Sequence, residues 1–167
     1  MAFENGQRVG TFSATDLDSL VAEAAGSPRR RQHRNLHASY ADACQRFFNA
    51  IEPDSYIRPH RHAAPSGPES LFAVRGRMAL IVFDDSGEIV EKVTFGSGVN
   101  AADAFGVEIP SGCWHTVVAL NSGSVLLEVK AGPFNPAQAK DFAPWAPEEN
   151  SVEAHVYIQA LRSAADA

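Results

Sequence analysis

Short segments rich in β-forming residues, separated by clusters of turn-forming residues, are the feature that most constrains the fold of this chain. The candidate strands are Arg46–Ile51, Ser55–His60, Leu71–Val74, Arg77–Phe83, Glu88–Phe95, Val107–Ile109, Trp114–Leu120 and Ser124–Lys130. Between two of them, the segment Phe83–Glu88 contains Gly87 and predicts a hairpin turn. About eight short strands with frequent turns favour a mainly β fold, a sandwich or a barrel, over an alternating β and α fold.

A helix is predicted ahead of the strands. Apolar residues recur at helical spacing between residues 17 and 24, and Thr15 suits the N-cap position. Gly26 and Pro28 are expected to end the helix.

Length and composition indicate one compact unit. The chain has 167 residues, of which 45% are hydrophobic, which is enough for one core and too short for a second large domain. The expected organisation is an N-terminal arm at residues 1–14, a single domain at residues 15–150 and a C-terminal tail at residues 151–167, which is weakly helical over residues 152–162.

Charge and cysteine content exclude several classes of function. Fourteen basic and twenty acidic residues give a formal net charge of -6, which argues against nucleic acid or an anionic membrane as a partner. The longest apolar runs, such as Met78–Phe83, are far shorter than the roughly 20 residues that cross a bilayer, and no signal-peptide pattern is present, so a cytoplasmic protein is expected. Cys44 and Cys113 form no CxxC pair, so any metal is expected to be held by nitrogen and oxygen.

The tetrapeptide Pro59–His62 contains the most informative pair of residues. Alternate side chains of a strand share a face, so His60 and His62 are expected to point the same way. Glu69 follows a segment of turn formers, residues 63–68, that can bring its carboxylate beside the two imidazoles.

A third histidine follows a second turn. Pro110 and Gly112 predict a turn before a strand whose second residue is His115. Three imidazoles and one carboxylate suit a divalent Fe, Mn, Ni, Zn or Cu ion and leave positions open if the metal is octahedral. Each motif by itself is typical of ordinary surface or core residues, and it is their order that favours a metal site. Cys113 shares the face of His115 and is expected to be a small buried side chain and not a ligand.

This order of residues resembles the two metal-binding motifs of the cupin superfamily. HxH, six residues, Glu69, six residues and Gly76 match the first motif, and PxGxxH ending at His115 matches the second. The asparagine and the early glycine of the second motif are Ala119 and Ala104 here. The resemblance implies a cupin double-stranded β-helix, a jelly-roll barrel, with the short helix at its N-terminal side.

The chain is also similar to the WbuC family, small cupins found with O-antigen polysaccharide gene clusters. The matching segments are Ser27–His33, Asn35–His37, Gln45–Arg46, Tyr56–His62, Trp114–His115, Glu128–Lys130, Gly132–Pro133 and Asp141–Pro147. They span most of the chain. This resemblance implies a cupin-fold metalloprotein with a link to polysaccharide biosynthesis, but it supplies no reaction.

Strand alternation places Tyr56 and Arg58 on the face of the histidine pair, aimed into the barrel. Arg58 is a candidate to bind a carboxylate or phosphate of a substrate, and Tyr56 is a candidate catalytic acid or base. The alternative for Arg58 is an ion pair with an internal carboxylate, Glu69 or Glu128.

The stretch from Arg29 to His37 carries four arginines and two histidines. No aromatic residues interleave for base stacking, so a nucleic-acid patch is disfavoured. A solvated loop is one interpretation. The other is a segment that folds over the barrel mouth and offers Arg29, His33, Asn35 or His37 to an anionic substrate.

The sequence leaves two functions open. One is a metalloenzyme on a small anionic or sugar-derived substrate, either an isomerase, epimerase or lyase or an Fe(II) dioxygenase. The other is a non-catalytic, metal-dependent module that binds a small ligand, because this fold hosts both kinds. A metal-free structural cupin is disfavoured, because it would not need all four ligands. The cupin resemblance also implies a homodimer formed through a sheet face that carries Phe72 and Val74.

Overall fold

The computed structural model describes residues 9–62, 67–98, 103–135 and 140–166. Its elements are α1 (Ala14–Gly26), β1 (Arg31–Asn35), β2 (Cys44–Ile51), β3 (His60–Arg61), β4 (Glu69–Arg75), β5 (Arg77–Phe83), β6 (Ile89–Gly96), β7 (Gly106–Ile109), β8 (Trp114–Ala119), β9 (Ser124–Ala131), β10 (Asp141–Phe142) and α2 (Val152–Asp166). Residues 1–8 of the expected arm and residues 63–66 of the expected turn lie outside the described residues.

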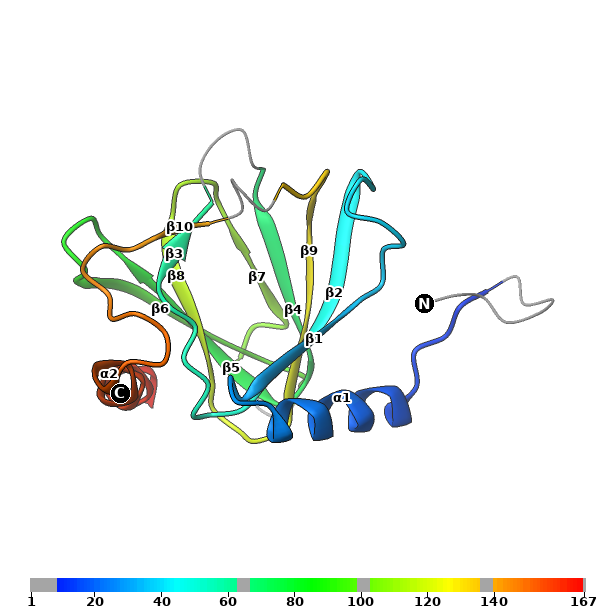
Figure 1. Cartoon of the computed structure of the whole chain (residues 1–167), viewed down its shortest axis with the longest axis horizontal. Coiled ribbons are helices and arrows are strands. Elements are labelled where there is room, and N and C mark those ends of the chain that lie inside the picture. Colours follow the sequence, from blue (N-terminus) through cyan, green and yellow to red (C-terminus); the bar gives the residue numbers. More distant parts are fainter. Residues whose placement is uncertain (1–8, 63–66, 99–102, 136–139, 167) are drawn as a thin grey trace.

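Within the described residues the strands form two five-stranded antiparallel sheets. The first has the order β1-β2-β9-β4-β7, and the second has the order β10-β3-β8-β5-β6. Figure 1 shows the two sheets facing each other, with both helices outside the space between them. The mainly β fold that the turn-separated segments predict is confirmed.

Three apolar clusters follow this layering. The central one lies between the sheets and includes Leu71, Met78, Phe95 and Leu126. A second cluster packs α1 against the outer face of the first sheet. The third packs α2 and residues 143–146 against the outer face of the second sheet. Each sheet therefore carries apolar residues on both of its faces, which explains the long β-forming runs.

The predicted strand Ser55–His60 is wrong, because only His60 and Arg61 pair in β3. Pro59 has no backbone N–H to donate to a ladder. The preceding residues are held instead by the C-terminal segment, since the Tyr56 hydroxyl donates to the carbonyl of Pro147 at 2.9 Å. Alternation of faces therefore does not extend from His60 back to Tyr56.

The basic segment contains a strand that its composition does not predict. Residues 31–35 form β1, at the edge of the first sheet, paired antiparallel with β2. Polar residues are common in edge strands, and residues of β1 line a cavity that contains polar side chains. Alternation along β1 puts Arg31, His33 and Asn35 on a common face.

Helix α1 begins earlier than predicted. Its N-cap is Ser13 and not Thr15: the Ser13 Oγ accepts from the N–H of Asp16 at 3.2 Å, and the Asp16 carboxylate accepts from the N–H of Ser13 at 2.8 Å. This reciprocal pair satisfies two backbone donors that a helix start otherwise leaves free. The helix ends at Gly26, as predicted.

Replacing Ser13 by alanine is expected to lower the free energy of unfolding by about 1 kcal/mol, the usual cost of removing a capping hydroxyl. Thr15→Ala, two residues further on, is the matched control and should change stability little, because Ala is the better helix former. Urea unfolding followed by circular dichroism measures both. Equal effects of the two substitutions would contradict the assignment of Ser13 as the cap.

Candidate metal centre

Four buried side chains converge between the two sheets. His60 lies in β3, His62 directly follows β3, Glu69 begins β4 and His115 lies in β8. One ligand atom from each lies within 4.8 Å of all the others. Strand register creates the cluster, because His60 is the Cα partner of His115 and Glu69 begins the strand on the opposite sheet. The structure thus brings together all four residues that the motifs single out.

Backbone carbonyls fix the tautomers of two of the imidazoles. The Nδ1 of His60 lies 3.0 Å from the carbonyl of Arg58, and the Nδ1 of His115 lies 2.9 Å from the carbonyl of Cys113. A carbonyl only accepts, so each Nδ1 carries a proton and each neutral ring presents the lone pair of Nε2 to the cluster. Burial holds the pKa of His60 well below its usual range, which keeps that ring neutral.

Glu69 places a carboxylate oxygen directly against two of these nitrogens. Its Oε1 lies 2.9 Å from Nε2 of His115 and 3.2 Å from Nε2 of His62. Burial opposes ionisation, but hydrogen bonds donated by His115 and His62, when their Nε2 atoms are protonated, outweigh it and hold the pKa of Glu69 well below its usual range. A carboxylate facing an imidazole lone pair at this distance needs a proton or a cation between them. Three nitrogens and one oxygen fit a divalent transition metal.

The turn of the second motif holds the first motif in place. The N–H of Gly112 and the hydroxyl of Ser111 both donate to the carbonyl of His62, at 2.8 and 3.0 Å. Gly112 has a φ of 82°, in the left-handed region that favours glycine. The PxG sequence therefore positions His62 as well as introducing the strand of His115. Cys113 is not part of the four-residue cluster. Its backbone carbonyl, and not its thiol, contacts His115 and orients that imidazole.

Two adjoining cavities give access to the cluster. The smaller, about 50 Å³, is lined by all four residues together with apolar side chains that include Leu71 and Val117. The larger, about 660 Å³, is lined mainly by β1, β2 and β9 and the loops next to them. The two share four lining residues, Asn49, Ile57, Glu128 and Lys140, so they lie directly next to each other.

The structure places the residues of the basic segment in the wall of the larger cavity. Arg29, His33, Asn35 and His37 all line it. His37 is 5% exposed, and within the described residues its Nε2 has no hydrogen-bond partner. The interpretation of this segment as a solvated loop is therefore incorrect for β1, although the predicted substrate-binding role of the four residues stays a prediction.

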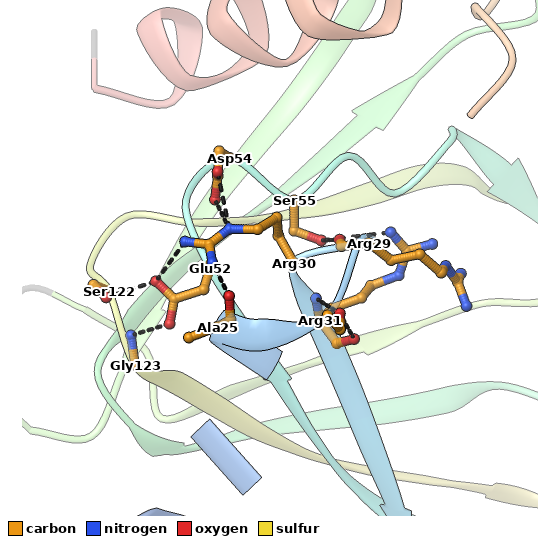
Figure 2. A network of polar contacts seen from close by, with 10 residues as sticks. Ala25, Arg29, Arg30, Arg31, Glu52, Asp54, Ser55, Ser122 and Gly123 are labelled. Atoms are coloured by element: carbon orange, nitrogen blue, oxygen red, sulfur yellow. Dashed lines mark hydrogen bonds and ion pairs between the residues drawn. The ribbon is translucent and has the colours of Figure 1, made fainter. Parts of the chain in front are cut away.

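A polar network anchors the turn that leads into β1 (Figure 2). Arg30 has a φ of 55°, and its Nε donates to both carboxylate oxygens of Asp54 at 3.0 Å. Its guanidinium also donates to the carbonyl of Ala25 and lies 4.0 Å from the buried Glu52. Arg30 is thus held away from the large cavity, whereas its neighbours on either side line that cavity.

Tyr56 and Arg58 do not occupy the positions that strand alternation predicts. Neither lines the two cavities, and Ile57 lines both. Tyr56 packs in the cluster with α2, where burial raises the pKa of its hydroxyl. Arg58 donates to the carbonyl of Ala143 at 3.1 Å and lies 3.9 Å from Glu148, so its carboxylate neighbour is neither of the two expected. The irregular backbone before His60 is the reason.

Sequence reasoning missed a partly buried ion pair in the cavity wall. The Nζ of Lys130 lies 2.6 Å from Oε1 of Glu128, and the two side chains are 17% and 13% exposed. Across the sheet Glu128 is flanked by Phe47 and Leu71, and Lys130 by Gln45 and Glu69. Burial raises the pKa of Glu128. Alternation along the predicted strand Ser124–Lys130 is the signal that would have placed both residues on the inner face.

Fold and site together define this chain as a cupin-fold protein with a buried three-histidine, one-glutamate cluster that can hold a divalent metal. The chain belongs to the family described as "Domain of unknown function (DUF6016)", whose model matches residues 12–95. No curated protein matches the chain.

Three solved structures illustrate the likeness of fold. Protein SO0799 from Shewanella oneidensis is 13% identical with a TM-score of 0.55, and the match covers 80% of this chain and 83% of that one. Oxalate oxidase in complex with the substrate analogue glycolate is 12% identical with a TM-score of 0.52, covering 84% and 75%. CapF with the inhibitor 3-isopropenyl-tropolone is 20% identical with a TM-score of 0.53, covering 70% and 32%, so this chain spans about a third of that protein. At these identities the comparisons show the fold.

Proposed function

We propose that this protein is a metal-dependent enzyme that acts on a small anionic substrate. The observation that carries the proposal is the buried cluster of His60, His62, Glu69 and His115, which lines a small chamber that adjoins a much larger cavity. A metal with only structural importance would need no such access. Oxalate oxidase, which shares the fold, is described with the small organic acid glycolate bound, and this supports an anionic substrate by analogy.

The charge of the cavity wall supports an anion. Among the described residues, four cationic side chains line the larger cavity, Arg29, Arg31, Lys130 and Lys140, against one carboxylate, Glu128. This local excess of positive charge stands out in a chain whose formal net charge is -6. A concave surface of one charge raises the local concentration of the opposite ion.

The chain's own residues have separable tasks in this proposal. The four cluster residues hold the metal, which when bound supplies Lewis acidity to an oxygen of the substrate. The wall formed by Arg29, His33, Asn35 and His37 binds and orients the anion. Glu128, whose carboxylate is held by Lys130 at 2.6 Å, lines both cavities and can accept a hydrogen bond from the substrate where they adjoin.

Elemental analysis of protein purified without a histidine tag tests the metal site. The parent is expected to hold about one equivalent of a transition metal after reconstitution, and His62→Ala is expected to lose most of it, because the substitution removes one of the four ligands and leaves the buried Glu69 carboxylate without one of its two imidazole neighbours. His155→Ala is the matched control, since His155 is an exposed residue of α2 far from the cluster. A parent protein without metal, or a His62→Ala variant with full metal content, would contradict the proposal.

The identity of the metal then directs the assay for turnover. Iron would lead to oxygen uptake with organic acids, as expected for the dioxygenase alternative, and Mn, Ni, Zn or Cu would lead to isomerisation or lyase assays. Metal-dependent binding of organic anions without turnover in any of these assays would favour the non-catalytic binding module.

The finer parts of the sequence interpretation stay predictions. They are membership of the WbuC family, the link to polysaccharide biosynthesis, the domain boundaries at residues 14 and 150, the cytoplasmic location and the homodimer. Phe72 and Val74 are 47% and 37% exposed, which is compatible with the predicted dimer face. No described helix has the length and hydropathy needed to span a membrane.

A further inference from the structure

The two adjoining cavities differ more than tenfold in volume. The chamber at the metal cluster measures about 50 Å³. A water molecule needs about 10–15 Å³ of such space, so the chamber admits only a few heavy atoms. The adjoining cavity, at about 660 Å³, is in the range that holds a whole drug-sized ligand. A ligand that fills this space must place a small group at the metal and its body in the larger cavity.

The larger cavity has the polar groups to hold a second anionic group far from the metal. Arg29 lines it, is 56% exposed at the side chain and lies 3.4 Å from Glu149. The same Glu149 carboxylate is already engaged by the buried Arg31 at 2.7 Å, so two guanidinium groups share one carboxylate. Burial lowers the pKa of His33, so this ring acts as a neutral hydrogen-bonding partner beside the arginines.

Aromatic side chains also line the larger cavity. The ring of Phe47 lines the cavity and lies against His33 at 5.8 Å between ring centroids and under the Nζ of Lys130 at 5.5 Å. Tyr40 and Phe134, whose rings are 5.1 Å apart, line the same cavity. Aromatic faces of this kind pack against the carbon skeleton of a ligand, including a sugar.

We infer that the substrate has two separate anionic or oxygen-rich ends: a small carboxylate-type head that reaches the cluster of His60, His62, Glu69 and His115, and a distal phosphate or carboxylate held by Arg29 and His33. This inference rests on the proposed function and adds the length and the bifunctional character of the substrate. It makes Arg29 and His33 determinants of specificity that act at a distance from the metal. A two-carbon acid such as oxalate would occupy only the metal end.

Isothermal titration calorimetry on the metal-loaded protein tests this inference with four six-carbon probes. 6-Phosphogluconate carries a carboxylate head and a distal phosphate, glucarate carries carboxylates at both ends, gluconate lacks the distal anion and glucose 6-phosphate lacks the carboxylate head. At least one of the two bifunctional probes is expected to bind about tenfold or more tightly than gluconate and glucose 6-phosphate, because it makes charge-assisted contacts at both ends. Whether phosphate or carboxylate suits the distal position follows from which of the two binds more tightly.

Variants separate the two ends. Arg29→Gln combined with His33→Gln is expected to reduce the binding of the bifunctional probe to the level of gluconate, with a much smaller effect on the binding of gluconate itself. Arg46→Gln is the matched control, because Arg46 is exposed, does not line the cavity and loses the same unit of charge. His115→Ala is expected to remove the binding of gluconate.

The outcomes distinguish this inference from the proposed function. If gluconate binds only in the presence of metal but neither bifunctional probe gains affinity, or if the gain persists in the double variant, the inference is overturned and the metal site stands. The inference is also overturned if no probe binds to protein that holds its metal. If the protein holds no metal at all, it is the proposed function that fails.

Discussion

Adding a divalent transition metal to the metal-free protein is expected to raise its melting temperature by about 5–11 °C. A ligand that binds only the folded state stabilises it by about 2.7 kcal/mol at a concentration one hundred times its dissociation constant, and a domain of this size gains roughly 2–4 °C per kcal/mol. The unfolded chain has no equivalent site, because His62 and His115 are 53 residues apart in sequence and meet only through the pairing of β3 with β8. Differential scanning calorimetry with and without metal measures the shift.

Two variants show whether the shift comes from the predicted ligands. His115→Ala should abolish the metal-induced rise in melting temperature, because it removes an imidazole whose Nε2 lies 2.9 Å from Glu69. His155→Ala, on the surface of α2, should keep the full rise. A rise of equal size in both variants would mean that the metal binds elsewhere on the chain.

Gly76→Ala is expected to lower the free energy of unfolding by about 2–4 kcal/mol. Gly76 joins β4 to β5 with a φ of 73°, and a Cβ there would lie 2.4 Å from Oγ of Ser124 and 3.0 Å from its Cα. Ser124 cannot move aside, because it is fully buried and its hydroxyl donates to the carbonyl of Asn121 at 2.7 Å. The closing glycine of the first motif is thus required by the fold and not by the metal.

Gly98→Ala separates the two causes of this loss. Gly98 also has a positive φ, 87°, but a Cβ there meets no atom of the described residues within 4 Å. Its replacement should cost only the backbone strain, about 1 kcal/mol. Urea unfolding of the two variants side by side gives the difference due to the clash with Ser124. Equal losses would show that steric contact at Gly76 contributes nothing.

The sequence determined the features that depend on neighbours along the chain. Arg77–Phe83 is predicted and observed as β5 with the same bounds, because its apolar β-forming residues are bracketed by turn formers. The hairpin after it follows from Gly87, whose φ is 92°. The order of His60, His62, Glu69 and His115 pointed to one site, and the structure brings these four side chains together.

Only the tertiary structure decided which other residues face the cavity. Local alternation placed Tyr56 and Arg58 inside, but hydrogen bonds to Pro147 and Ala143, more than 80 residues away, hold them outside. The basic residues of β1 have no local signal for a strand and become one because β2 offers an unpaired edge. Glu128 and Lys130 form the wall because β9 runs between β2 and β4. Periodicity along a chain reports which residues share a face, whereas the partner of that face is set by contacts between segments distant in sequence.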